Sequence, residues 1–108
     1  MTITHCFSVD VEGFCEGMAE SFPIPAEMVR TQIEKDEIAS NVDETLEFLD
    51  THQVKGTFFI LGIIAQEQPN VVRSIAAAGH EIGSHCYEHL RLNIMDPATA
   101  EEVISRSK

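Results

Sequence analysis

The stretch KGTFFIL, residues 55–61, decides the fold class of this chain of 108 residues. It is a nearly continuous apolar run that ends at Gly62, as expected of a strand covered on both faces in a parallel sheet. The segment before it has the period of a helix, because residues 37–52 repeat an apolar side chain every three or four positions. These apolar side chains are Ile38, Val42, Leu46 and Leu49. The two patterns together predict that strands and helices alternate.

The N-terminal third of the chain has weaker patterns. Residues 2–9 alternate between apolar and polar side chains, which predicts a first strand ending at Asp10. Residues 13–25 contain two glycines and two prolines without a clean period, so we expect an irregular loop there. A short helical turn is expected at residues 26–36.

The C-terminal half continues the alternation. A second helical region is broken by Pro69 and stops at Gly79. Residues 81–84 form a short third strand, and a last helix begins at Asp96-Pro97 and runs to about residue 105. Strands that alternate with helices pair in parallel through right-handed crossovers, and such folds bind ligands at the carboxyl ends of their strands. The sequence therefore predicts an α/β fold with its site at that edge.

Composition narrows the classes of protein and partner. A hydrophobic content of 44% and a charged content of 23% are typical of one globular domain. A formal net charge of −11 makes nucleic acid and anionic membranes unfavourable partners. Three scattered cysteines form no disulfide framework, and the sequence shows neither a long apolar span nor a signal-peptide pattern. We therefore expect a cytoplasmic protein without membrane contact.

Two carboxylates, Asp10 and Glu12, follow the first strand. Side chains two residues apart in an extended chain point to the same face, where their charges repel unless a cation lies between them. A metal ion would bind one carboxylate and leave the other as a base. The alternative is a polar strand end that makes turn hydrogen bonds.

Two histidines, His85 and His89, follow the third strand. They share one face if the segment turns helical after His85, and imidazole is a good ligand for zinc and similar ions. The alternative is a pair of structural histidines. Cys86 is expected to lie buried beside the site, and the remaining histidines, His5, His52 and His80, are expected to be structural.

The segments KGTFFILG (residues 55–62) and GHEIGSHCYEH (residues 79–89) resemble the second strand and the metal-binding His motif of polysaccharide deacetylases, the NodB-homology or carbohydrate esterase 4 family. SVDVEG (residues 8–13) resembles the paired acidic motif of that family. The resemblance implies the N-terminal portion of a distorted (β/α) barrel, with residues 1–108 forming a partial domain.

The resemblance also implies roles for four residues. Asp10 aligns with the catalytic base, and Glu12, His85 and His89 align with the metal ligands. The implied metal is zinc, with cobalt, nickel or manganese as alternatives. The implied substrate is an N-acetylated sugar or polysaccharide, which loses its acetyl group to a metal-bound water. Glu12 is one methylene longer than the usual Asp, and Cys86 replaces the usual Ser or Thr.

No segment after His89 matches the later elements of that family, which carry the base-orienting Arg and the general-acid His. We therefore expect these 108 residues to bind metal weakly and to turn over slowly or not at all. Two other functions stay open: an inactive fragment or half-barrel that self-associates through an open sheet edge, and a hydrolase of small amides.

Overall fold

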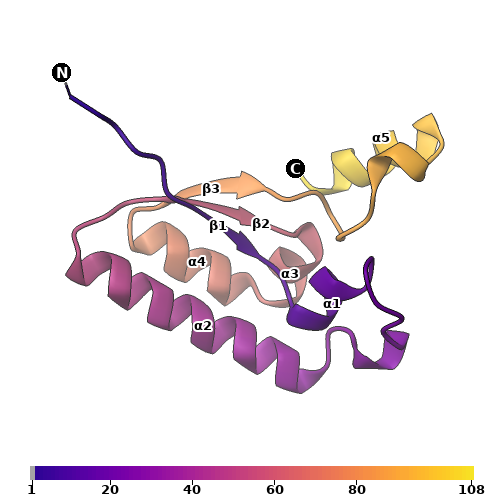
Figure 1. Ribbon diagram of the computed structural model, residues 1–108, viewed down its shortest axis with the longest axis horizontal. Coiled ribbons are helices and arrows are strands. Elements are labelled where there is room, and N and C mark those ends of the chain that lie inside the picture. Colours follow the sequence, from indigo (N-terminus) through magenta and orange to yellow (C-terminus); the bar gives the residue numbers. More distant parts are fainter. Residues whose placement is uncertain (1) are drawn as a thin grey trace.

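Three parallel strands form the centre of the molecule (Figure 1). The computed structural model describes residues 2–108. The strands are β1 (Ser8–Val11), β2 (Thr57–Ile60) and β3 (Glu81–Ser84), and they lie in the order β1-β2-β3. Asp10 in β1 is opposite Phe59 in β2, which is opposite Gly83 in β3. The predicted α/β class with parallel strands is confirmed.

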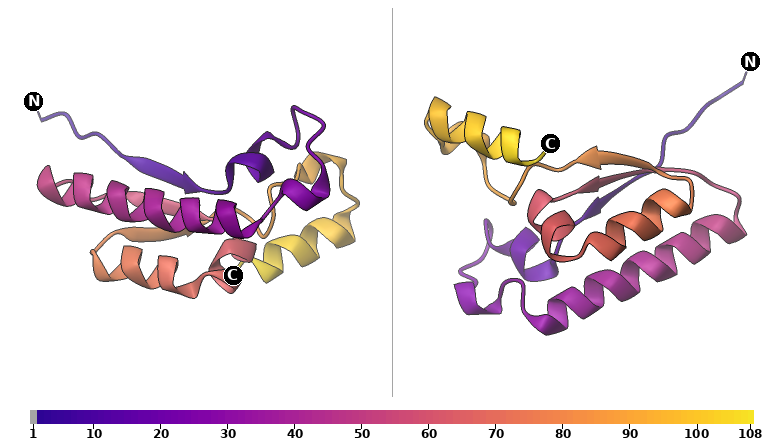
Figure 2. Two further views of the ribbon diagram at one scale, coloured as in Figure 1. Left: turned by 90° about the horizontal axis from the view of Figure 1, so that it is seen from below. Right: turned by 180° about the vertical axis from the view of Figure 1, so that it is seen from behind.

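Helices connect the three strands, and a further helix follows the last strand. The helices are α1 (Phe14–Met18), α2 (Gln32–Thr51), α3 (Gly62–Glu67), α4 (Pro69–Ala77) and α5 (Pro97–Arg106). Two 3₁₀ turns lie at Ala26–Met28 and Leu92–Ile94. Helices α2 and α4 run side by side along one face of the sheet (Figures 1 and 2). Helices α1, α3 and α5 lie near the carboxyl ends of the strands. No helix within residues 2–108 combines the length and apolar character needed to cross a bilayer.

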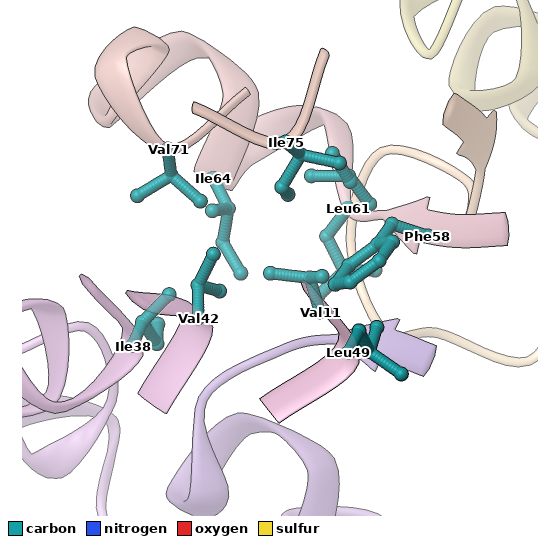
Figure 3. Close-up of a cluster of buried hydrophobic side chains, with 10 residues drawn as sticks. Val11, Ile38, Val42, Leu49, Phe58, Leu61, Ile64, Val71 and Ile75 are labelled. Carbon is teal, nitrogen blue, oxygen red and sulfur yellow. The ribbon is translucent and has the colours of Figure 1, made fainter. Parts of the chain in front are cut away.

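The hydrophobic core lies between the sheet and helices α2, α3 and α4 (Figure 3). The most completely buried side chains are Leu49, Phe58, Leu61, Ile64 and Ile75. Burial of each contributes about 1.5–3 kcal/mol relative to exposure. The predicted apolar stripe of α2 is present, since Ile38, Val42 and Leu49 are buried and Leu46 packs against the core.

The opposite face of the sheet is open within the described residues. The expectation that β2 is covered on both faces is wrong for this part of the chain, because Phe58 and Ile60 are buried whereas Phe59 is 37% exposed. The continuous apolar run predicted two covered faces, but residues 2–108 supply helices to only one of them.

Three boundaries differ from the sequence expectation. β1 begins at Ser8 instead of residue 2, because β2 pairs with β1 only from Ser8 onward. The expected loop at residues 13–25 contains helix α1. Helix α2 begins at Gln32, where the Thr31 side chain accepts a hydrogen bond from the backbone N–H of Glu34, so it starts earlier than the expected residue 37.

The C-terminal elements agree with the sequence expectation. β3 has the predicted bounds, and Gly79 has the positive φ of 84° that allows the chain to leave α4. The Asp96 carboxylate accepts a hydrogen bond from the N–H of Thr99, which caps α5. The helix ends at Arg106, one residue beyond the expected end.

Candidate metal centre

Three side chains meet at the carboxyl edge of the sheet. Glu12 directly follows β1, His85 directly follows β3, and His89 lies four residues later in the next loop. One ligand atom of each lies within 4.8 Å of the ligand atoms of the other two. The sequence predicted that the two strand ends would come together, and the structure places the three residues in one cluster.

The carboxylate of Glu12 lies between the two imidazoles. Its Oε2 is 3.3 Å from Nε2 of His85 and 3.1 Å from Nε2 of His89. The imidazole centroids are 5.5 Å apart, and their planes meet at 68°. The side chains of Glu12, His85 and His89 are 28%, 29% and 25% exposed. The cluster is therefore half-buried and open to small molecules.

The cluster fits a divalent ion in both donor chemistry and spacing. Two imidazoles and one carboxylate are a ligand set of catalytic zinc sites. Ligands about 2.0–2.1 Å from a tetrahedral ion lie about 3.3 Å from one another, close to the distances from Glu12 to the imidazoles. The same distances also suit a carboxylate that accepts hydrogen bonds from two imidazoles. The donor set and these two distances therefore fit a divalent ion.

The loop that carries the histidines is not helical. The condition that the segment turns helical after His85 is not met, because Cys86 has a left-handed φ of 66°, which redirects the backbone. The imidazoles still meet because the N-terminus of α3 holds the loop. The N–H groups of Gly62 and Ile63 donate to the carbonyls of Cys86 and Tyr87 at 2.8 and 2.9 Å.

Tyr87, in the same loop, contacts helices α3 and α5. Its ring is buried, and its hydroxyl donates to Oε1 of Gln66 in α3 at 2.8 Å. The Arg106 guanidinium of α5 lies 4.0 Å from the centre of the Tyr87 ring, a cation–π contact. Gly62 packs against this residue so closely that a Cβ there would lie 2.8 Å from Cδ2 of Tyr87.

Asp10 is not part of the cluster of Glu12, His85 and His89. It is exposed in β1, on the face of the sheet that carries Phe59 and Gly83. Within residues 2–108 its carboxylate makes no hydrogen bond or ion pair, so it is accessible to a ligand. Its assignment as a base stays a prediction.

A groove of ≈ 430 Å³ adjoins the two histidines. Its lining residues are Glu20, Ser84, His85, Cys86, Glu88, His89, Leu90, Arg91 and Leu92. Nε of Arg91 donates to Oε2 of Glu20 at 3.0 Å and links the loop after α1 to the loop after β3. Cys86 is half-buried in the wall of this groove, as expected, and is not among the clustered ligands.

Sequence reasoning missed a buried polar cluster behind Glu12. Nη1 of Arg30 contacts Oε1 of Glu16 at 3.0 Å, and Glu34 is 4% exposed. Burial raises the pKa of the Glu16 carboxyl, and Arg30 opposes this shift. One signal was present, because Thr31 and Glu34 have the spacing of a capping box at a helix start.

Comparison with known proteins assigns the chain to one family. The polysaccharide deacetylase family model matches residues 31–108. A chitooligosaccharide deacetylase of Bradyrhizobium sp. (strain ANU 289) is 35% identical over 66 residues, which are 60% of this chain and 30% of that protein. A peptidoglycan-N-acetylglucosamine deacetylase of Bacillus cereus is 51% identical over 47 residues, or 44% of this chain and 17% of that protein.

A solved structure resembles nearly the whole chain. Puue allantoinase superposes with a TM-score of 0.74 at 26% sequence identity, and the match covers 94% of this chain and 39% of that chain. The predicted fold class, part of a (β/α) barrel, is confirmed by this likeness. The chain spans 39% or less of the length of each of these three proteins. The family model covers both histidines, whereas Asp10 and Glu12 precede the matched region.

Proposed function

Because the chain belongs to the polysaccharide deacetylase family, we propose that it carries the N-terminal part of the active site of a metal-dependent hydrolase that removes acetyl groups from N-acetylated sugars. The observation that carries this proposal is the cluster of Glu12, His85 and His89, whose ligand atoms lie within 4.8 Å of one another. The residues of this cluster follow two separate strands, and one of these strands, β1, lies outside the region that the family model matches.

Each residue of the site has a proposed role. Glu12, His85 and His89 hold the ion, and zinc is the proposed metal because imidazole and carboxylate suit it. A bound ion of this kind polarises an acyl carbonyl and lowers the pKa of its bound water to about 7. Asp10 has an exposed carboxylate in β1, the strand that ends directly before Glu12, so it is the proposed acceptor of a proton from the attacking water.

The groove beside the histidines is the proposed substrate site. Its walls combine apolar side chains with the Glu20–Arg91 ion pair, and this mixture suits a sugar, which has both apolar and hydroxyl surfaces. The named relatives favour oligomers of N-acetylglucosamine as the first substrates to test. The likeness to Puue allantoinase supports a small cyclic amide as the second candidate.

Titration of the 108-residue chain with Zn²⁺ in a calorimeter tests the metal centre. We expect binding in the micromolar range that is lost in both His85→Ala and Glu12→Ala. His5→Ala is the matched control, since it removes an exposed imidazole away from the cluster and should leave binding unchanged. Binding that survives both ligand substitutions would overturn the metal centre.

Activity is tested separately with chitooligosaccharides and with allantoin. We expect slow turnover of one of them, lost in Asp10→Asn while Zn²⁺ binding is kept. Turnover that persists in Asp10→Asn would contradict the assigned base. Binding of Zn²⁺ without turnover of either substrate would instead favour an inactive or self-associating half-barrel.

A further inference from the structure

Glu34 is a buried carboxylate that the proposed chemistry does not use. Its side chain runs from the first turn of α2 to the back of the turn that follows Glu12. Oε1 accepts a hydrogen bond from the N–H of Cys15 at 2.7 Å, and Oε2 accepts one from the N–H of Arg30. The two oxygens thus tie α1 and the start of α2 together through backbone groups. Such charge-assisted hydrogen bonds are stronger than neutral ones.

Two glycines make room for this arrangement. A Cβ on Gly13 would overlap the carboxylate of Glu34. A Cβ on Gly17 would lie 3.0 Å from Oε1 of Glu12, the oxygen that does not face the imidazoles. Helix α1 therefore packs against the back of the Glu12 carboxylate, and its placement limits where Oε2 can lie.

Arg30 shows that the arrangement is held under strain. Its φ of 55° is in the left-handed region, which a non-glycine residue enters at a cost of about 1–2 kcal/mol. Its N–H contacts Glu34 and its guanidinium contacts the buried Glu16 of α1. Arg30 is thus bound to α2 through its backbone and to α1 through its side chain, and a strained residue persists where its surroundings fix it.

From these contacts we propose that Glu34 is a positioning residue for metal binding: it fixes α1, and α1 holds the Glu12 carboxylate between the two imidazoles. The inference rests on the proposed metal centre. It adds that the affinity of that centre depends on a carboxylate that is not a ligand. Loss of an outer group that orients a ligand typically weakens metal binding by about 10–100-fold.

The experiment compares Glu34→Gln with Glu37→Gln in the 108-residue chain. Both substitutions remove one carboxylate from the first two turns of α2, but Glu37 is exposed and has no such contacts. A glutamine at position 34 has one acceptor oxygen, so it can serve only one of the two N–H groups. Co²⁺ titration followed by visible absorption reports both affinity and ligand geometry, and amide hydrogen exchange reports protection of Cys15 and Arg30.

We expect Glu34→Gln to weaken Co²⁺ binding about 10-fold or more, to change the absorption band, and to lose protection at Cys15 or Arg30. Glu37→Gln should match the wild type in all three.

Unchanged Co²⁺ affinity and spectrum in folded Glu34→Gln would overturn the positioning role, even if stability falls. If that variant does not fold, Gly17→Ala decides, because a methyl there would lie 3.0 Å from Oε1 of Glu12, and the carboxylate must shift by a few tenths of an ångström. Unaltered Co²⁺ binding in Gly17→Ala would overturn the proposal. Failure of the wild type to bind Co²⁺ would overturn the metal centre itself and the positioning role with it.

Discussion

His80 is a buried histidine whose role is structural. Its Nδ1 accepts a hydrogen bond from the N–H of Gly56 at 3.1 Å, and its ring lies 5.0 Å from that of Phe58. Burial lowers the pKa of His80, and the positive charge of Lys55 lowers it further. The folded state therefore favours the neutral imidazole, which keeps the acceptor that joins the start of β2 to the start of β3.

The stability contributed by His80 should fall in acid. A folded-state pKa below the unfolded value of about 6.5 means that the unfolded chain binds more protons below that pH. The free energy of unfolding of the wild type should therefore decrease from pH 7.5 toward the lowered pKa by more than that of His80→Gln. Urea unfolding at a series of pH values measures this difference. His52→Gln, at an exposed imidazole, is the control, and a pH-independent difference between wild type and His80→Gln would contradict the assignment.

Single residues differ in how far the sequence could predict them. Glu12 and His85 could be paired because each follows a strand, and parallel strand ends share an edge. Glu34 could not be placed, because its partners are backbone N–H groups whose positions depend on the path of a loop. Its capping-box spacing with Thr31 indicated a helix start and nothing about Cys15.

At the level of elements, α3 is the support of the histidine loop. Its first N–H groups have no partners within the helix and instead donate to the carbonyls of Cys86 and Tyr87. The loop needs this support because Cys86 has a left-handed backbone and because no helix forms after His85. Changes at the start of α3 should therefore affect metal binding at a distance.

Gly62→Ala tests this support. Its methyl would lie 2.8 Å from Cδ2 and 3.2 Å from Cα of Tyr87, so the loop must move. We expect a loss of stability of about 1–3 kcal/mol together with weaker Zn²⁺ binding by calorimetry. Gly79→Ala is the matched control: its positive φ should cost about 1–2 kcal/mol, but it lies at the far end of α4 and should leave Zn²⁺ affinity unchanged. Equal affinities in both variants would exclude the proposed support.

Element length explains which elements the sequence predicted. Helix α2 has 20 residues, enough for its apolar stripe to repeat several times. Helix α1 has 5 residues and cannot show a period, so its segment was expected to be a loop. Residues 2–7 alternate like a strand, but within the described chain only Phe7 bonds to a neighbouring strand: its carbonyl accepts from the N–H of Thr57 at 3.0 Å.

The molecule as a whole has more surface than a compact domain of its size. Its accessible surface is 7430 Å², whereas a folded protein of this mass is expected to expose about 6,000 Å². Its radius of gyration is 15.1 Å, against about 13 Å expected for this length. Within residues 2–108 the sheet has an open face that carries Phe59 and edge strands at β1 and β3. Exposed apolar surface and free strand edges are features through which chains pair.

We predict that the 108-residue chain self-associates through this surface, against the repulsion of its net charge. A net charge of −11 repels a second copy, and salt screens that repulsion because the Debye length falls to about 10 Å at 0.1 M. Sedimentation velocity should therefore show a larger associated fraction at high salt than at low salt.

Phe59→Ser should reduce this associated fraction, because it removes an aromatic ring from the open face of the sheet. Phe48→Ser is the control. Phe48 is 59% exposed and lies on α2, the helix that packs on the covered face of the sheet, so this substitution removes an exposed ring that is not on the open face. A monomer at both salt concentrations, or equal effects of the two substitutions, would show that the open face does not drive association.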